Sequence, residues 1–272
     1  MDKIAIFKGK KIRRIIYQDE WWFSVVDVVE ALTDSINPRI YWGVMKNRLE
    51  KDEGIQLFTI CKQLKLQSSD GKKYETDCAN TEGIFRIIQS IPSPKAEPFK
   101  RWLAKVGYER VQEIEDPELA MKRMKAIYEQ KGYPKDWIEK RTRGIAVRNE
   151  LTDEWKSRGA KEGLEYAILT NEIMKGTFGL TVQEYKDLKD LDRENLRDHM
   201  DDIELILTML GEATTTRLTR DRNSKEFKKL QKDAKDGGSV AGRTRKDIES
   251  KSSQKVVNPK NYIFKKQILD AA

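Results

Sequence analysis

The sequence predicts an α+β protein. A small mixed domain of β hairpins and short helices, residues 1–115, precedes an all-α domain, residues 116–216, and a basic helical tail, residues 217–272. Three observations predict this organisation. The length of 272 residues suffices for about two domains. β-branched and aromatic runs bounded by polar turns lie in the first part. Beyond Asp116, apolar residues recur almost throughout at helical spacing.

Three strands are expected at the start of the chain. Residues 3–8 and 12–17 are rich in isoleucine and flank the basic turn at 8–11, which is typical of a β hairpin. Residues 21–24 (WWFS) predict a third strand, because aromatic residues favour strands. The N-terminal residues do not form the basic and then apolar pattern of a secretory signal, and we expect no membrane span.

Two short helices follow and predict a helix-turn-helix-like arrangement. Residues 25–33 place apolar side chains at i, i+3, i+4 and i+7, which is one stripe of an amphipathic helix. Ser24 is expected to cap this helix, with Asp27 as the acid of a capping box. Asn37 followed by proline starts a second helix, 38–49. In such an arrangement the second helix is the one that contacts DNA.

The rest of the first domain alternates strands and helices. Residues 55–66 and 72–79 predict a β pair joined by the polar turn 68–72 (SSDGK). Residues 80–90 predict a helix, and a further helix, 93–107, is expected to end at its glycine.

Helix signals dominate the second domain. Gly132 stops one helix, and Thr181 with Glu184 forms a capping-box pattern. A longer helix is expected to begin at Asp192 and to pack in a bundle.

The basic tail is expected to contain a charged helix at residues 222–236. Gly237 and Gly238 should break it, because two glycines weaken a helix interior. Residues 240–250 should resume as a short helix, and residues 251–272 should stay loose until a partner or a second copy holds them.

Three motifs in order carry a resemblance to a known family. They are residues 22–32 (WFSVVDVVEAL), 80–88 (NTEGIFRII) and 96–103 (AEPFKRWL). Together they strongly resemble the BRO N-terminal domain of phage antirepressors and viral BRO proteins, over about residues 3–110. The resemblance implies DNA binding and transcription regulation.

The helical half resembles a second family. Residues 184–191 (EYKDLKDL) and 198–205 (DHMDDIEL) are similar to the C-terminal half of the bacterial DNA-damage-inducible protein D, over about residues 165–250. That family also has a BRO-like front half and is linked to recombinase regulation. This resemblance implies a bacterial or prophage protein of the DNA-damage response, with a recombinase or a repressor as partner.

Charge placement also favours DNA as the partner. The net charge is +8, and residues 217–272 contain 16 of the 53 Lys and Arg residues but only 7 of the 45 Asp and Glu residues. Basic side chains neutralise phosphates, and arginine reads guanine edges. The alternative for each of these residues is an ordinary solvated face. The candidate DNA-binding residues are Lys10, Lys11, Arg13, Arg14, Arg39, Lys46, Arg48, Lys72, Lys73, Lys228, Lys229, Arg243 and Arg245.

Other chemistry is weakly supported. His199 stands among aspartates, but neighbouring helical residues point apart and suit a metal poorly. Glu154 and Lys156 match part of a nuclease pattern but lie in a predicted helix. The two cysteines lack metal or redox spacing, which predicts free thiols in a reducing cytoplasm. Trp21, Trp22 and Trp42 are candidates for base stacking if single strands are bound, although packing in the core is the competing role.

We therefore expect a non-enzymatic DNA-binding regulator with no cofactor. It should bind duplex DNA in preference to single strands, through the BRO-like domain. We expect a homodimer, since symmetric pairs raise DNA affinity, in the cytoplasm and associated with the nucleoid. The alternative is a protein-interaction module that binds and modulates a recombinase or a repressor.

Overall fold

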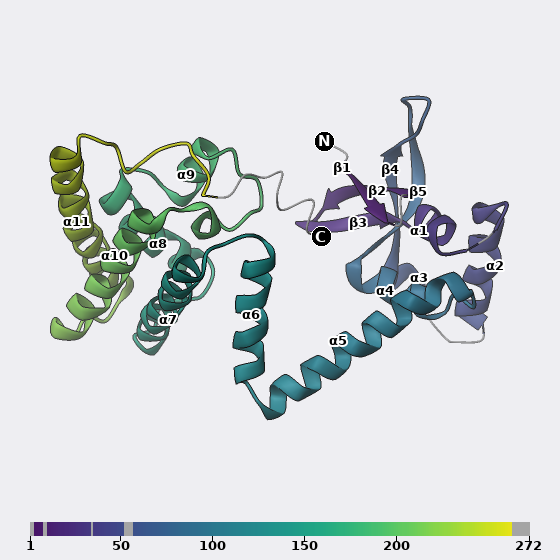
Figure 1. Cartoon of the computed structure of the whole chain (residues 1–272), viewed down its shortest axis with the longest axis horizontal. Coiled ribbons are helices and arrows are strands. Elements are labelled where there is room, and N and C mark those ends of the chain that lie inside the picture. The colour runs from purple at the N-terminus through teal and green to yellow at the C-terminus, as the bar shows by residue number, and fades with distance from the viewer. Residues whose placement is uncertain (1–2, 8–9, 34, 52–56, 263–272) are drawn as a thin grey trace. The chain divides into compact units, whose positions relative to one another are not determined.

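The computed structural model describes residues 3–7, 10–33, 35–51 and 57–262. The chain divides into two compact units, residues 1–117 and 118–272, and each is described by itself. The first unit combines a sheet with short helices, and the second is helical (Figure 1). The α+β class predicted from the sequence is confirmed.

The first unit is built on one antiparallel sheet of five strands in the order β1-β2-β3-β5-β4. Central pairing joins Ile15 to Trp22 and Trp22 to Asn80. The β4–β5 hairpin extends beyond the other strands (Figure 1). The strands are β1 (Lys3–Phe7), β2 (Lys10–Tyr17), β3 (Glu20–Ser24), β4 (Cys61–Gln67) and β5 (Lys73–Asn80).

Helices of the first unit pack on one face of this sheet, chiefly those that start at Val25 and Thr81. The helices are α1 (Val25–Leu32), α2 (Pro38–Lys51), α3 (Leu57–Ile60), α4 (Thr81–Gln89) and α5 (Glu97–Glu115), with a 3-10 turn η1 (Pro94–Ala96) before α5. Their buried side chains, among them Val25, Leu49 and Ile87, form one core with Ile12 and Ala79 of the sheet.

Two predictions for the first unit are wrong in detail. Residues 57–60 form the short helix α3, so the strand predicted at 55–66 starts only at Cys61. The helix predicted to end at Gly107 continues to Glu115. Gly107 does not stop it because it has no positive φ, and the following residues keep the helical hydrogen-bond pattern.

The cap of α1 is confirmed, but its acid has another role. The Ser24 side chain accepts a hydrogen bond from the backbone N–H of Asp27, as predicted. The Asp27 carboxylate does not return a bond to the backbone of Ser24. It accepts hydrogen bonds from Arg13 of β2 instead. The cap residues therefore also fasten α1 to the sheet.

The second unit is a helical bundle in which α8, α10 and α11 pack together and α7 packs on α10. Its buried residues form two neighbouring clusters, one around Trp137 and Tyr185 and one around Leu151 and Trp155. The helices are α6 (Glu118–Gln130), α7 (Lys135–Ser157), α8 (Leu164–Phe178), α9 (Val182–Leu188), α10 (Asp202–Asp221) and α11 (Phe227–Ser252), with a 3-10 turn η2 (Leu196–His199).

Capping boxes mark the starts of two of these helices, α9 and α10. The capping box of Thr181 and Glu184 is present at the start of α9, as predicted. The longer helix expected from Asp192 begins only at Asp202, because Asp201 forms a second capping box with Glu204. The prediction of a start at Asp192 is therefore wrong by ten residues.

Helix α11 runs without a break through Gly237 and Gly238, so the predicted break is wrong. The glycines lie in the bundle interior, where α11 meets α8 and α10. A Cβ atom on Gly238 would stand 2.5 Å from the carbonyl oxygen of Ile173, and one on Gly176 would stand 2.6 Å from the carbonyl carbon of Gly238. These glycines therefore allow backbones to approach closely, which outweighs their poor helix propensity.

The segment after α11 packs onto the bundle as far as it is described. Lys189 donates a hydrogen bond to the carbonyl oxygen of Lys260 at 2.6 Å, and Tyr262 stacks on Trp137 at 5.5 Å between ring centroids. Residues 251–262 are thus held by their own chain, contrary to the prediction of a loose end. The remaining predicted residues, 263–272, lie outside the described residues. No helix in the described ranges is long and apolar enough to cross a membrane.

The predicted tail, 217–272, does not stand apart from the bundle over its described part. Helix α11 supplies Leu230 and Ala234 to a core cluster that also contains Trp155. Most of the tail is accordingly part of the second unit.

Candidate nucleic-acid interface

Arg13 fastens the sheet to α1 and is not an open cation. Its Nη2 and Nε atoms donate to the two carboxylate oxygens of Asp27 at 2.6 and 2.8 Å. Its side chain is 28% exposed, and that of Asp27 is 12% exposed. The hydrogen bond to Asp27 raises the pKa of Arg13. A partly buried guanidinium that already donates two hydrogen bonds to a carboxylate has few donors left for a phosphate.

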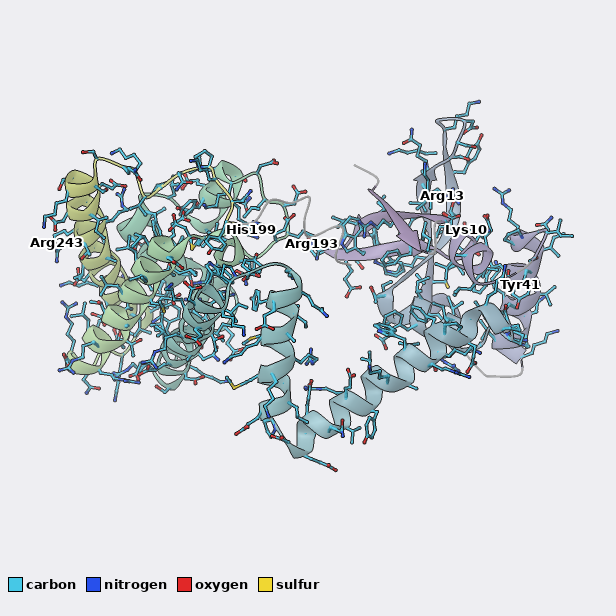
Figure 2. All side chains as sticks on the ribbon, in the orientation of Figure 1. Lys10, Arg13, Tyr41, Arg193, His199 and Arg243 are labelled. Atoms are coloured by element: carbon cyan, nitrogen blue, oxygen red, sulfur yellow. The ribbon has the colours of Figure 1, made fainter. Side chains whose placement is uncertain are left out.

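Two neighbouring basic residues of β2 are also engaged. Lys10 binds the carboxylate of Glu30 at 3.2 Å on the surface. The Arg14 guanidinium lies 4.3 Å from the centroid of the Trp21 ring, a cation–π contact, and burial lowers its pKa. Lys10 and Arg14 therefore both have partners within the first unit. Figure 2 labels Lys10, together with Arg13 of the preceding paragraph.

Helix α2 is held to the sheet by the residues that were expected to read DNA. Lys46 Nζ and Trp42 Nε1 both donate to Asp77 of β5, at 2.8 and 2.7 Å. Burial of Asp77 opposes ionisation, but the bonds from Lys46 and Trp42 outweigh it, and the pKa of Asp77 is lowered. Arg48 donates to the carbonyl oxygen of Ser90. The polar side chains on the inner face of α2 thus hold the helix to the rest of the first unit.

The outer face of α2 is apolar. Ile40 and Val44 are 65% and 66% exposed, and Ile36 just before the helix is fully exposed. These side chains line a groove of about 590 Å³ together with Arg48 and Pro92. Exposed aliphatic groups of this kind are better suited to binding a protein partner than to binding a DNA phosphate backbone.

Four of the predicted residues of the first unit remain open cations. Lys11, Arg39, Lys72 and Lys73 are exposed and form no side-chain hydrogen bond or ion pair with any residue in the described ranges. Lys72 and Lys73 lie at the turn of the β4–β5 hairpin, which projects from the unit. Lys65 on the same hairpin is exposed too, but it is not among the residues chosen from the sequence. The available signal was its position in the strand predicted at 55–66, which forms this hairpin with 72–79.

Helix α11 carries a row of exposed basic side chains. Lys228, Lys232, Lys235, Arg243 and Lys246 recur at spacings of four, three, eight and three residues, and all five are exposed. At 100° per residue these spacings keep them within about 80° of one another around the helix. We call this set the α11 stripe. Its ends are 18 residues apart, or about 27 Å along the axis.

Acidic residues of α11 do not neutralise the α11 stripe. Asp233 and Asp236 pair with Arg222, and Asp247 pairs with Lys251. Arg243 donates to its neighbour Ser239 and lies on the outer side of the helix (Figure 2). The α11 stripe therefore keeps its positive charge toward solvent.

The structure sorts the four α11 residues chosen from the sequence. Lys228 and Arg243 lie in the α11 stripe, and Lys229 is exposed beside it. Arg245 points inward, where it donates to the carbonyl oxygen of Thr177 at 2.8 Å and pairs with Glu249. Lys232, Lys235 and Lys246 are not among the candidates chosen from the sequence. Only the unbroken helix puts them in line.

The alternative chemistries find little support in the geometry. Trp22 and Trp42 are 6% and 2% exposed, so neither presents a ring for base stacking. His199 is buried, and the described residues contain no group of three or more His, Cys, Asp and Glu side chains placed to hold a metal ion. Glu154 lies in α7, as expected from the sequence, and binds Arg158 and Arg220.

The cysteines are free thiols, as predicted. Cys78 is buried and Cys61 partly so, and burial raises the pKa of each to about 12. At neutral pH both are therefore protonated and poor nucleophiles.

Comparison with known families covers the first unit. A search of curated proteins finds no match to the chain. No family match extends over the helical half, so its resemblance to the DNA-damage-inducible protein D stays a prediction. The family model described as BRO family, N-terminal domain, matches residues 11–111, which run from the second strand of the sheet into α5. Residues 11–111 of the first unit are thus a BRO N-terminal domain.

Proposed function

We propose that this protein is a non-enzymatic DNA-binding regulator that contacts duplex DNA through two positive surfaces. One is the β4–β5 hairpin of the BRO N-terminal domain, with Lys65, Lys72 and Lys73. The other is the α11 stripe of the helical unit. The antirepressor and DNA-damage roles expected from the two resemblances belong to the same proposal.

The α11 stripe is the observation that carries the proposal. Its five exposed cations span about 27 Å, and each strand of duplex DNA has one phosphate per about 3.4 Å of helix axis, so several phosphates are reachable from one helix face. Contacts of this kind release counterions, give affinity without sequence preference and weaken with salt. The hairpin is suited to a groove edge, because a two-stranded ribbon fits the major groove.

Charge reversal tests the contribution of the α11 stripe. The double variant Lys232→Glu with Arg243→Glu should weaken binding to a labelled duplex by at least tenfold in fluorescence anisotropy at about 0.1 M salt, since each lost phosphate contact removes about one released ion. The matched control is Lys125→Glu with Lys161→Glu, which changes the net charge equally at exposed sites of the same unit. Equal loss in both variants would reduce the effect to net charge and contradict a defined surface.

The hairpin is tested separately. Lys72→Glu with Lys73→Glu should weaken duplex binding severalfold and leave the melting temperature unchanged, because neither side chain has a partner among the described residues. Lys46→Glu is unsuited to this purpose, since it would break the pair with Asp77 and disturb the fold. Full affinity in the hairpin variant would remove the BRO N-terminal domain from the interface.

A second candidate function rests on the outer face of α2. Its exposed Ile40 and Val44 and the groove beside them favour the protein-interaction module that modulates a recombinase or a repressor. The variant Val44→Asp should abolish capture of a purified recombinase or repressor and leave DNA affinity unchanged. The expected homodimer is measured in the same samples by light scattering. Loss of the dimer in Val44→Asp would assign this face to self-association instead.

A further inference from the structure

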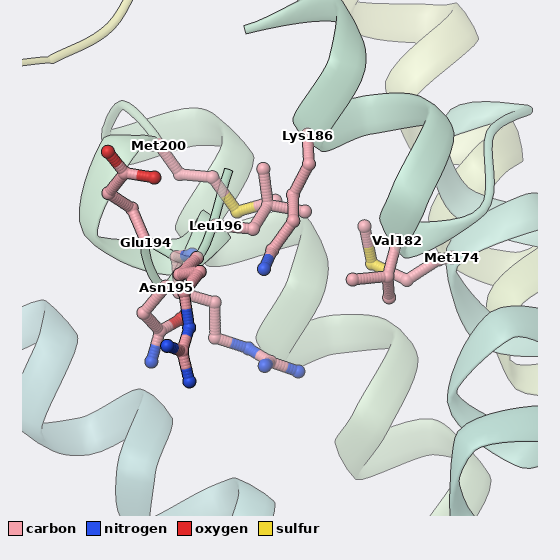
Figure 3. Close-up of a pocket in the computed structure, with 9 residues that line it drawn as sticks. Met174, Val182, Lys186, Glu194, Asn195, Leu196 and Met200 are labelled. Atoms are coloured by element: carbon pink, nitrogen blue, oxygen red, sulfur yellow. The ribbon is translucent and has the colours of Figure 1, made fainter. Parts of the chain in front are cut away.

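A cavity of about 310 Å³ lies in the second unit between α8, α9 and the turn η2. Its apolar lining is formed by Met174 and Val182 on one side and by Leu196 and Met200 on the other, and Figure 3 shows Lys186 extending between these two pairs. The basic lining residues are Lys186, Arg193 and Arg197. This cavity is separate from the α11 stripe, which none of its lining residues belongs to.

Positive charge dominates the polar lining. Lys186 forms no ion pair or side-chain hydrogen bond with the part of the chain that the structure describes. Arg197 binds Glu212 at 2.6 Å, but Arg148 binds the same carboxylate oxygen at 3.4 Å, so one negative charge serves two arginines. Arg193 adds a further guanidinium to the lining.

Two polar details are consistent with a ligand. The Nε atom of Arg197 is buried and has no hydrogen-bond partner among the described residues, so a donor is left over beside the cavity. The lining acid Glu194 accepts a hydrogen bond from the backbone of Asp192, and its carboxylate points away from Lys186 in Figure 3. The centre of the cavity is therefore short of negative charge.

We propose that this cavity binds a nucleoside monophosphate. Lys186 and Arg197 would bind the phosphate, which pairs well with ammonium and guanidinium donors. The base would lie against Met174 and Met200, since thioethers make favourable contacts with aromatic rings. The volume of 310 Å³ is at the small end of ligand cavities, which are about 300–1,000 Å³.

The phosphate has two sources that share this chemistry, a free mononucleotide and the 5′-phosphorylated end of a nucleic-acid strand. Calorimetric titration of the full chain with adenosine monophosphate, adenosine and inorganic phosphate tests the site itself. Adenosine monophosphate should bind at least tenfold more tightly than either fragment, because only it contacts both the basic and the apolar lining residues. Equal affinity for inorganic phosphate would overturn the assignment of a nucleoside. A short single strand with and without a 5′-phosphate then tells the two sources apart.

Lys186 gives the decisive variants. Lys186→Met keeps an apolar stem of similar length and should weaken binding of adenosine monophosphate by about tenfold, the loss expected for one charge-assisted hydrogen bond. Lys186→Glu should abolish it. Both variants should melt at the wild-type temperature and bind duplex DNA normally. Lys235→Glu, in the α11 stripe, should weaken duplex binding and bind adenosine monophosphate normally. No binding of adenosine monophosphate at about 1 mM, or equal binding by Lys186→Met, would overturn the proposal and leave the DNA-binding function untouched.

Discussion

At the scale of single residues, Asp77 is the clearest structural anchor of the first unit. It accepts bonds from Lys46 and Trp42 of α2 and from Gln63 of β4, so it joins a helix to two strands. Its side chain is 17% exposed, and that of Lys46 is 39% exposed. Solvent screening at Lys46 therefore limits the contribution of the ion pair to about 1 kcal/mol.

The lowered pKa of Asp77 predicts a pH dependence. A group with a lowered pKa in the folded state stabilises the fold above its unfolded value, about 3.9, and loses this contribution as pH falls through its folded pKa. Asp77→Asn should therefore lower the melting temperature at pH 7, and the gap to the wild type should shrink toward pH 3. Melting curves at both pH values measure this. A gap that stays constant would show that the charge of Asp77 has no stabilising role.

Residue types could be predicted from the sequence, but their partners could not. Arg13, Lys46 and Arg48 are basic residues that were expected to contact DNA. Each instead forms a hydrogen bond with a residue 14 to 42 positions away in the chain. Such pairs depend on how helices settle on the sheet, which the local pattern does not contain. Lys72, by contrast, lies at the turn of the β4–β5 hairpin, where exposure follows from the turn itself. Lys11 was predicted in a turn but is the second residue of β2.

At the scale of elements, α11 determines whether the basic residues form one surface. Glycine is a poor helix former, so local propensity predicts a break at Gly237 and Gly238. Packing against α8 reverses that prediction, because Gly238 lies against the backbone of Ile173 and its neighbour Gly242 against that of Gly176. The cap of α1 and the capping box of α9 were predictable, since both depend on residues three positions apart.

Helix propensity and close packing predict opposite effects of alanine at Gly238 on the free energy of unfolding. If the glycine serves only flexibility, Gly238→Ala should stabilise the helix by up to about 1 kcal/mol. Close packing instead predicts a loss of about 1–3 kcal/mol in the free energy of unfolding, since the new methyl group would stand 2.5 Å from the carbonyl oxygen of Ile173. Denaturant titration measures the difference. Gly107→Ala in α5, where a Cβ meets nothing within 4 Å, is the control and should stabilise.

At the scale of the whole molecule, charge and family likeness divide between the two units. Residues 11–111 match the BRO N-terminal domain, and the α11 stripe lies in the helical unit. The α+β class could be predicted from hydrophobic periodicity. The merging of α11 with the bundle could not, because it rests on contacts with α8 and α10.

The salt dependence of duplex binding by the full chain tests the central claim most directly. We expect the logarithm of the binding constant to fall linearly with the logarithm of salt concentration. The neutral variant Lys232→Gln with Arg243→Gln should make that slope shallower by about 2, one for each phosphate contact removed. A variant with the wild-type slope and affinity would contradict the claim that the α11 stripe binds the DNA backbone.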